Sequence, residues 1–459
     1  MEYGAGSDLL FGSAESAIGP TKRYRFRYWK RIYGALHAPL EEIVKRKTAI
    51  LLGAGARGNI YAHYAKECPE EFQIVGVAEP DRARREQFVK EYGIAAEHAC
   101  ESWEQLLGQP KFADACLVCT MDDMHTKPAV QALTLGYHVL LEKPMANTEA
   151  ECRQIEQAAS GSGLVLSVCH VLRYTPFYSK IKQLLDDGVL GQMLCMQQIE
   201  NVGYWHQAHS FVRGNWNNSE TTSPMLLQKS CHDMDIISWL MDSRCSRVSS
   251  FGSLTHFKPE NAPDKAPLRC LDGCPAAAAC PYYAPRFYLE HPRAEKDGFV
   301  SAITTDTTRK GILEALESGP YGRCVYHCDN NVVDHQVVNL EFENSATASF
   351  VMTAFTEDCN RTLKIMGTRG ELIGDMEKNE IIYQVFNDPD PVRITVEMPK
   401  VKNSYNHGGG DFYLIRDFVR AVQAEETAQN KTTAAQSLQA HVMCFAAEKA
   451  RNRHMVVEL

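Results

Sequence analysis

Three glycines, Gly53, Gly55 and Gly58, stand between an apolar run and a helical pattern of apolar residues. In a turn of this kind the first glycine permits the tight bend and the second lets the backbone approach a pyrophosphate. The third lets the following helix pack closely on the strand. The N-terminus of that helix directs free N–H groups at the phosphates. The spacing therefore predicts a dinucleotide site made of Gly53, Gly55, Ala56, Arg57 and Gly58.

A carboxylate, Glu79, ends a second apolar run over residues 73–79, about 20 residues after the last glycine. A carboxylate there accepts hydrogen bonds from the adenosine ribose hydroxyls and repels a 2′-phosphate, which favours NAD over NADP. Arg82, Arg84 and Arg85 lie nearby and weaken that preference. The alternative is that Glu79 only starts a helix after a core strand.

Two further segments carry candidate substrate-binding groups. Residues 204–216 mix aromatic rings with hydrogen-bonding groups, a combination that suits the C–H faces and hydroxyls of a sugar. An arginine there would pair bidentately with a carboxylate or sulfonate. Residues that follow the apolar run 164–169 fall where ligands gather in open α/β sheets. The candidates are His206, His209, Arg213 and Asn215 in the first segment and His170, Arg173 and Tyr174 in the second. For each residue of the first segment, a looped core position with satisfied polar groups is an equal alternative.

Cys270, Cys274 and Cys280 form a compact group, and Cys324 and Cys328 come later. Thiolates at short spacing bind zinc or an iron–sulfur centre. Three ligands at irregular spacing are a weak signal, however, so free thiols in a lid-like loop are expected and no metal is predicted.

The apolar patterns change character along the chain. Between residues 48 and 145 short apolar runs alternate with helical patterns, which predicts a parallel sheet covered on both faces. These runs are 48–52, 73–79, 115–120 and 138–142, and run 164–169 is expected to return to the same sheet. After about residue 172 strictly alternating runs predict antiparallel strands over 337–343, 346–353, 361–366 and 380–386. Two helices, near 409–424 and 433–451, close the chain.

Chain length and the changes in apolar pattern divide the 459 residues into four parts. We expect an N-terminal extension over 1–46, a nucleotide-binding domain over 47–171, a second α/β domain over 172–405 and C-terminal helices over 406–459 that pack back on the body. The extension contains a basic and aromatic cluster at 22–31. That cluster suits either an anionic partner or membrane surface, or an arm that wraps the body or a neighbouring subunit.

Net charge and hydrophobicity exclude some classes of binding partner. A net charge of −9 argues against nucleic-acid binding, and no apolar run is long enough to span a bilayer. The N-terminus lacks the charged-then-apolar order of a secretory signal, so a cytoplasmic location is expected. In that reducing compartment the 16 cysteines are expected to be mostly thiols or ligands.

Leu141-Glu142-Lys143-Pro144, following the glycine-rich turn, resembles the glucose–fructose oxidoreductase and inositol dehydrogenase (Gfo/Idh/MocA) family. Agreement extends to Thr120 and His125, to 188–191, to 230–235 and to 407–411, and the similarity spans about 48–455. It implies a Rossmann domain, a doubly wound parallel sheet, joined to an α/β domain with a large, mostly antiparallel open sheet. That open sheet often mediates oligomerisation, so a homodimer or homotetramer is expected. Thr120, His125, Glu142 and Lys143 are implied to contact the cofactor.

The resemblance also implies the chemistry. Hydride transfer to nicotinamide needs a base for the alcohol proton and a cation for developing alkoxide character. The resemblance places Lys143 beside the nicotinamide and the reacting hydroxyl, and it implies that His232 is the base. Asp235, at i+3, would orient or charge the imidazole. A helix-capping or core histidine is the alternative for His232.

The chain departs from the family at one position. The family aspartate four residues before the histidine is Gln228 here, and Lys229 is its neighbour. A cation at Lys229 would lower the pKa of His232 and favour its neutral form.

The resulting prediction is an NAD-dependent oxidoreductase acting on a secondary hydroxyl of a sugar, glycoside or cyclitol. One rival is a glycosidase that uses tightly held NAD for transient oxidation, elimination, hydration and re-reduction. In that rival Tyr174, His206 or His209 would supply the extra base. A non-catalytic NAD sensor is a third interpretation.

Overall fold

The computed structural model describes residues 45–296, 298–398, 407–425 and 430–459. Residues 46–459 form one compact unit. The basic and aromatic cluster predicted at 22–31, with nearly all of the extension, lies outside the described residues.

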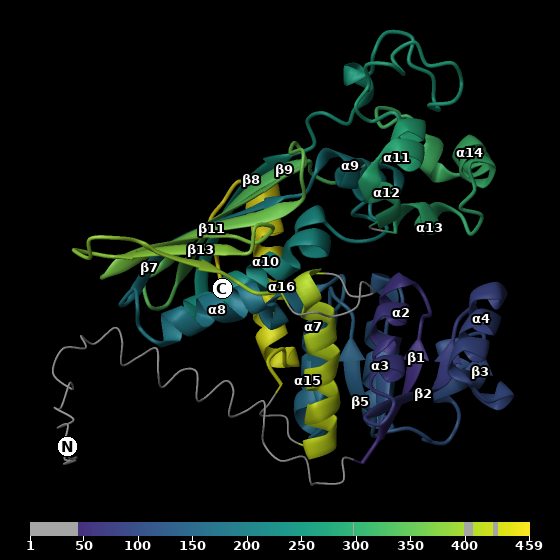
Figure 1. The fold of residues 1–459 in the computed structure, drawn as a ribbon, viewed down its shortest axis with the longest axis horizontal. Helices are drawn as coiled ribbons and strands as arrows, with labels where there is room; N and C mark the ends of the chain where they lie inside the picture. The colour runs from purple at the N-terminus through teal and green to yellow at the C-terminus, as the bar shows by residue number, and fades with distance from the viewer. Residues whose placement is uncertain (1–44, 297, 399–406, 426–429) are drawn as a thin grey trace, which may run out of the picture. The chain divides into compact units, whose positions relative to one another are not determined.

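The N-terminal half is built on a six-stranded parallel sheet (Figure 1). Its strand order, β3-β2-β1-β4-β5-β6, is that of a doubly wound nucleotide-binding sheet. The strands are β1 (Lys47–Leu52), β2 (Phe72–Ala78), β3 (Ala99–Cys100), β4 (Ala115–Val118), β5 (His138–Leu141) and β6 (Leu166–Val168). The predicted apolar runs are therefore confirmed as strands, and run 164–169 does return to this sheet.

Helices cover both faces of this sheet because successive strand side chains point to opposite sides. Ala49 and Leu51 of β1 face one core, whereas Ile50 and Leu52 face the other. The helices and 3₁₀ turns of this half are α2 (Ala56–Ala62), α3 (Tyr64–Glu67), α4 (Arg82–Tyr92), η1 (Ala96–His98), α5 (Trp103–Leu107), η2 (Asp122–Met124), α6 (Thr126–Thr134), α7 (Glu149–Ser162) and η3 (Val171–Tyr174). The next helix, α8 (Pro176–Asp186), packs in the core of the second sheet.

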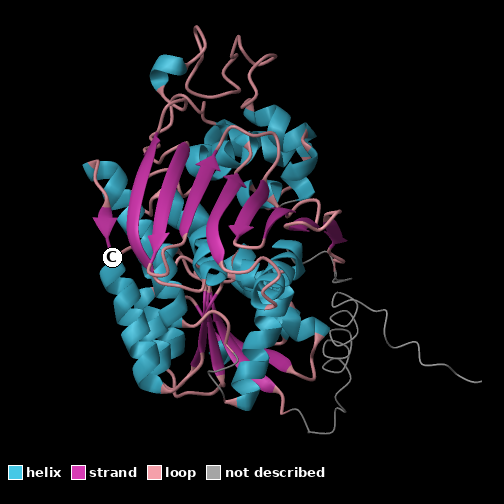
Figure 2. Cartoon of the chain, turned by 90° about the vertical axis from the view of Figure 1, so that its left-hand side faces the viewer, coloured by secondary structure: helices cyan, strands magenta, loops and turns pink. Residues whose placement is uncertain are grey.

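The second sheet has nine strands and is mostly antiparallel, as predicted. Its order is β14-β13-β12-β11-β7-β10-β9-β8-β15, and β7 and β10 form its one parallel pair. The strands are β7 (Met193–Asn201), β8 (Cys245–Ser253), β9 (His335–Phe342), β10 (Thr347–Thr353), β11 (Asn360–Gly367), β12 (Gly370–Asp375), β13 (Glu380–Val385), β14 (Val392–Thr395) and β15 (Val457–Glu458). Figure 2 looks onto one face of this sheet, along which the strands are visible.

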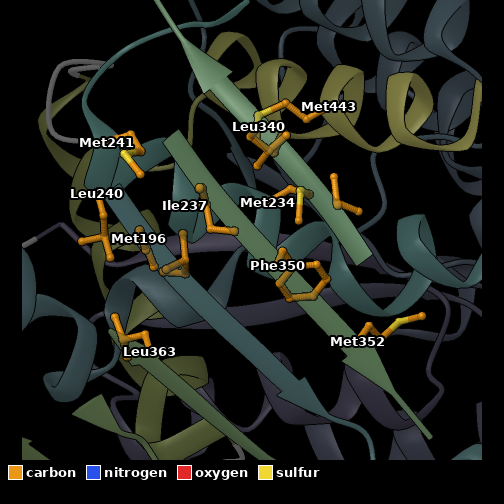
Figure 3. Close-up of a cluster of buried hydrophobic side chains, with 14 of the residues drawn as sticks. Met196, Met234, Ile237, Leu240, Met241, Leu340, Phe350, Met352, Leu363 and Met443 are labelled. Carbon is orange, nitrogen blue, oxygen red and sulfur yellow. The ribbon is translucent and has the colours of Figure 1, made fainter. Parts of the chain in front are cut away.

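The opposite face packs on α10 (Met225–Met241) and α16 (Ala434–Arg453). Figure 3 shows Phe350 and Leu363 from the strands meeting Ile237 and Leu240 from α10, with Met443 of α16 beside Leu340. This apolar layer fixes the helix α10, which carries His232.

An insert between β8 and β9 and a helical segment near the end of the chain complete the fold. Residues 254–334, between β8 and β9, form a small insert that packs on α9 (Tyr204–His206) and the π-helix η4 (Gln207–Arg213). The insert contains η5 (Pro259–Asn261), α11 (Ala284–Glu290), α12 (Pro292–Lys296), α13 (Phe299–Ile303), α14 (Arg309–Ser318) and η6 (Pro320–Gly322). Near the end of the chain, η7 (His407–Gly409) leads into α15 (Gly410–Ala424), whose Leu414 and Phe418 join one core of the parallel sheet.

Candidate active site

The glycine-rich turn has the shape that a pyrophosphate requires. Gly53 adopts φ +92°, and a Cβ on Gly58 would meet the Gly53 carbonyl oxygen at 2.1 Å, so neither position accepts a side chain. Around Gly55, in contrast, a Cβ would meet no heavy atom within 4 Å. Helix α2 begins at Ala56 without a side-chain cap. Open space and uncapped N–H groups therefore coincide where the phosphates of a dinucleotide bind.

Glu79 is buried at the carboxyl end of β2, next to this turn. Its Oε2 accepts the backbone N–H of Ala54 at 2.8 Å, and its Oε1 accepts that of Asp81 at 3.0 Å. The carboxylate thus braces the turn, and each oxygen keeps a second lone pair for a ribose hydroxyl. Arg84 lies 4.0 Å from Oε1.

The side chain of Arg57 points inward rather than toward the turn. Its Nε donates to Glu142 at 2.7 Å, and its Nη2 donates to Asp411 at 2.6 Å. Tyr61 also donates to Glu142, at 2.7 Å. Burial by itself raises the pKa of Glu142, but the charges of Arg57 and Lys143 and these hydrogen bonds hold it below its ordinary value. The side chains of Arg57 and Glu142 thus bind each other and clamp the turn to the end of β5. Their predicted contacts with the cofactor stay predictions.

His125 is likewise a positioning residue. Its side chain is buried, with Nδ1 2.7 Å from the Pro144 carbonyl oxygen and Nε2 3.1 Å from that of Thr120. Both nitrogens face protein carbonyls, and the predicted contact of His125 with the cofactor stays a prediction. The ring holds Thr120, whose hydroxyl donates to Met124, against the loop that contains Lys143.

Lys143 and His232 converge, although they are 89 positions apart in sequence. Lys143 follows β5, and its Nζ donates to the Gln228 carbonyl oxygen at 3.1 Å, four residues before His232 on the same helix. His232 is buried, and its Nδ1 has no hydrogen-bond partner. A buried imidazole nitrogen without a partner beside an ammonium group is suited to a substrate hydroxyl.

Burial lowers the pKa of His232 well below its ordinary value, and the Lys143 charge lowers it further. Two other imidazoles flank it: the ring centroids of His170 and His407 each lie 5.8 Å away. His170 is fully buried with both ring nitrogens unpartnered, and burial lowers its pKa as well. His232 is therefore neutral near pH 7 and able to accept a proton.

Lys229 does not act on His232 as predicted. Its Nζ lies 3.1 Å from Glu200, and its charge affects His206, whose pKa is lowered by burial and then by Lys229. Lys143 is the lysine that acts on His232. Lys229 and His232 are three residues apart and share a helix face, which is why the sequence suggested that they interact. The long side chain of Lys229 instead reaches a different partner, Glu200.

Three predicted site residues have partners within the protein. Arg173 and Asp235 form a bidentate pair, with Nε–Oδ2 at 2.7 Å and Nη2–Oδ1 at 2.6 Å, and both side chains are buried. Asp235 is thus paired with Arg173, and the predicted site roles of both residues stay predictions. Tyr174 is buried in the core, with its hydroxyl 3.2 Å from that of Thr432.

Most of the predicted sugar-binding segment is interior packing. The Nδ1 of His209 lies 2.6 Å from the Tyr288 hydroxyl. The guanidinium of Arg213 donates to the carbonyl oxygens of Arg323 and Tyr282. Asn215 is exposed in the turn that follows. The predicted substrate contacts of His209 and Arg213 stay predictions. In the same segment, the charge of Lys229 helps to lower the pKa of His206.

One buried carboxylate near Lys143 has no prediction from the sequence. Asp122 is buried, and burial raises its pKa although His125 and Lys143 act in the other direction. With its amide oriented to satisfy both neighbours, Gln228 donates to Asp122 and accepts from the Trp216 indole, each at 2.8 Å. A second missed pair, Arg361 and Glu200, lies 2.9 Å apart beneath Lys229. Asp122 follows β4, so its place at a strand's carboxyl end was the available signal.

Comparisons with known proteins agree with this geometry. Residues 47–170 match the model of an oxidoreductase family with an NAD-binding Rossmann fold, and residues 182–459 match the C-terminal alpha/beta domain of the same family. The chain is 25% identical to the oxidoreductase YteT of Bacillus subtilis over 401 residues, which are 81% of this chain and 88% of that protein.

Two further relatives match a smaller part of the chain or have lower sequence identity. An inositol 2-dehydrogenase of Klebsiella pneumoniae is 26% identical over 45% of this chain and 58% of its own length. The structure of levoglucosan dehydrogenase in complex with NADH superposes with a TM-score of 0.67 at 16% identity, over 90% of this chain and 99% of that one. The structural similarity supports the fold.

No helix of the described ranges is both long and apolar enough to cross a bilayer. The family models together account for most of the chain, and the uncapped, open glycine turn fits the nucleotide that they imply. The chain belongs to the Gfo/Idh/MocA family of NAD-binding oxidoreductases.

Proposed function

We propose that this oxidoreductase oxidises a secondary hydroxyl of a sugar, glycoside or cyclitol. The observation that carries the proposal is the unpartnered, neutral imidazole of His232 beside the ammonium group of Lys143. Bound NAD supplies the hydride acceptor.

Each residue has a distinct part in this proposal. His232 takes the proton of the reacting hydroxyl, since its lowered pKa keeps the ring unprotonated. Lys143 donates a hydrogen bond to the same oxygen and stabilises its developing negative charge. The Gln228 carbonyl, at 3.1 Å, holds the ammonium group in place. Glu79 and the backbone at Gly53–Gly58 hold the dinucleotide.

The test is steady-state formation of NADH from a panel of sugars, glycosides and cyclitols. We expect His232→Asn to lower kcat/KM by about 10²- to 10⁴-fold, the range of general-base loss, with little change in NAD affinity. His454→Asn is the control, because His454 is exposed and its φ of +52° suits asparagine. Unchanged turnover in His232→Asn would remove the proposed base.

The rival redox-assisted glycosidase keeps one specific support: His206 provides another imidazole, half-buried, whose lowered pKa leaves it a base. Nitrophenyl glycosides separate the two reactions. Stoichiometric NADH without nitrophenol indicates the dehydrogenase, whereas nitrophenol release without net NADH indicates the glycosidase.

A further inference from the structure

Four cysteines from separate segments meet in the insert between β8 and β9. Residues 268–270 pair with 322–324 in antiparallel fashion: the Cys270 N–H donates to the Gly322 carbonyl at 2.9 Å, and the Cys324 N–H donates to that of Leu268 at 2.8 Å. Arg269 and Arg323 are directly opposite, so their neighbours Cys270 and Cys324 project from the same side of this pair.

Cys274 and Cys280 come from the turns that follow Cys270. The Ala277 N–H donates to the Cys274 carbonyl at 3.2 Å, and the Cys280 N–H donates to the Ala276 carbonyl at 2.8 Å. All four cysteines line one pocket of about 10 Å³, room for roughly one water-sized sphere. The backbone thus places four cysteines, up to 54 positions apart, around one pocket.

A buried cation at the same place lacks a carboxylate partner. The side chain of Arg213 is 3% exposed, and it donates to two carbonyl oxygens and, at 3.7 Å, to the Cys270 sulfur. Within the described part of the chain, no Asp or Glu forms an ion pair with it. Isolated buried charges are costly, so this guanidinium indicates a negative counter-charge nearby. The thiolate form of the surrounding cysteines would provide that charge.

We propose that Cys270, Cys274, Cys280 and Cys324 bind one structural zinc ion. Four thiols lose their protons to solvent and ligate Zn²⁺ at about 2.3 Å, which gives a site of net charge −2 that Arg213 partly offsets. The Arg213–Cys270 contact is the outer-shell hydrogen bond that such ligands receive. The small pocket favours a single ion over an iron–sulfur cluster, which needs a larger void.

The side chains need to rotate to form this site. Among the described residues, no three His, Cys, Asp or Glu side chains already stand together as metal ligands. Rotation about χ1 moves a cysteine sulfur without moving the backbone that places the four residues around the pocket. The zinc would cross-link the turns at 270–280 to the segment at 322–324, and Arg213 would connect both to η4.

Metal analysis of the full-length protein, purified without chelators, tests the proposal. We expect about one zinc per chain. Cys274→Ser and Cys280→Ser should retain at least ten-fold less zinc after dialysis, and Arg213→Met should weaken zinc binding about 10- to 100-fold. Cys328→Ser is the matched control, because Cys328 contacts the Cys324 carbonyl without lining the pocket.

A second measurement uses the unmodified chain, in case a variant fails to fold. Removal of metal should lower Tm, and equimolar Zn²⁺ but not Mg²⁺ should restore it. Cobalt substitution should add thiolate-to-metal charge-transfer absorption. Less than about a tenth of a zinc per chain after reconstitution, iron with acid-labile sulfide in its place, or full zinc content in Cys274→Ser would each overturn the proposal.

Discussion

At the residue scale, the site depends on one cation placed next to one buried imidazole. Lys143 and His232 lie on different elements, and the Gln228 carbonyl holds the lysine where its charge lowers the pKa of the histidine. Because the group with the lowered pKa is the proposed base, the same contact that positions Lys143 also sets the pH range in which His232 can accept a proton.

Replacing Lys143 should therefore change the pH profile as well as the rate. In the native enzyme the acid limb of kcat/KM should lie well below pH 6.5, since His232 remains neutral there. Lys143→Met removes a cation that lowers this pKa, so the acid limb should move to higher pH while kcat falls about 10²-fold or more. The measurement is kcat/KM against pH from residual activity.

Lys229→Met provides the comparison, because Lys229 is paired with Glu200 and is not among the main causes of the lowered pKa of His232. Its acid limb should stay near that of the native enzyme. An equal displacement in both lysine variants would contradict the assignment of Lys143.

The Arg173–Asp235 pair should matter for stability rather than for substrate affinity. Arg173→Ala leaves Asp235 buried without its partner, which should lower the free energy of unfolding by about 3–5 kcal/mol. Arg153→Ala, which breaks the exposed pair with Glu149, should cost less than about 0.5 kcal/mol. Urea unfolding measures both. A ten-fold higher KM in Arg173→Ala at native stability would instead support substrate binding.

At the element scale, the turn between β1 and α2 contains two glycines with different roles. Gly58 is needed for packing, whereas Gly55 faces the space proposed for the ligand. Gly55→Ala adds a methyl group that meets no protein atom, so the unliganded chain should keep its Tm. That methyl group fills the space proposed for the pyrophosphate, and the Kd for NAD should rise at least about ten-fold.

Gly58→Ala, in contrast, should lower the stability of the chain even without ligand. Its Cβ would lie 2.1 Å from the Gly53 carbonyl oxygen, so the helix must shift and the free energy of unfolding should fall by about 1–3 kcal/mol or more. Thermal unfolding without ligand and calorimetric titration with NAD distinguish the two variants. Native NAD affinity in Gly55→Ala would place the phosphates elsewhere.

At the scale of the whole molecule, buried neutral histidines make the fold sensitive to acid. His441 of α16 accepts the Met145 N–H at its Nε2 at 2.8 Å, and its Nδ1 lies 2.7 Å from the Ser437 carbonyl oxygen. Burial and the neighbouring His170 lower its pKa to about 3. Between pH 6.5 and 3 the unfolded chain binds a proton at this position that the folded chain does not bind.

Stability should consequently fall as pH falls below 6.5, by up to about 1.4 kcal/mol per pH unit for each such histidine. His441→Gln retains an acceptor for the Met145 N–H and should reduce this slope by about that amount between pH 6 and 4.5. The free energy of unfolding, measured against pH, checks it. His454→Asn should leave the slope unchanged, and a native slope in His441→Gln would exclude His441 as a source.

Much of the architecture followed from local patterns. Apolar runs located β1, β2, β4, β5 and β6, and alternation located β9, β10, β11 and β13. Strands β7 and β8 lacked a prediction because polar residues interrupt their apolar patterns. Strands β12 and β14 have six and four residues, and β3 and β15 have only two each. The parallel pairing of β7 with β10 depends on a long crossover that no local pattern records.

The sequence by itself determined the glycine turn and the strand ends that carry Glu79 and Lys143. These depend on neighbouring residues, whose φ/ψ preferences and apolar period act locally. Only the tertiary structure decided which charges meet. Spacing suggested Asp235 and Lys229 as partners of His232, but Arg173 and Glu200 neutralise them from distant segments. A buried charge is stabilised by whichever opposite charge the fold brings within a few ångströms, and distance along the chain does not report that.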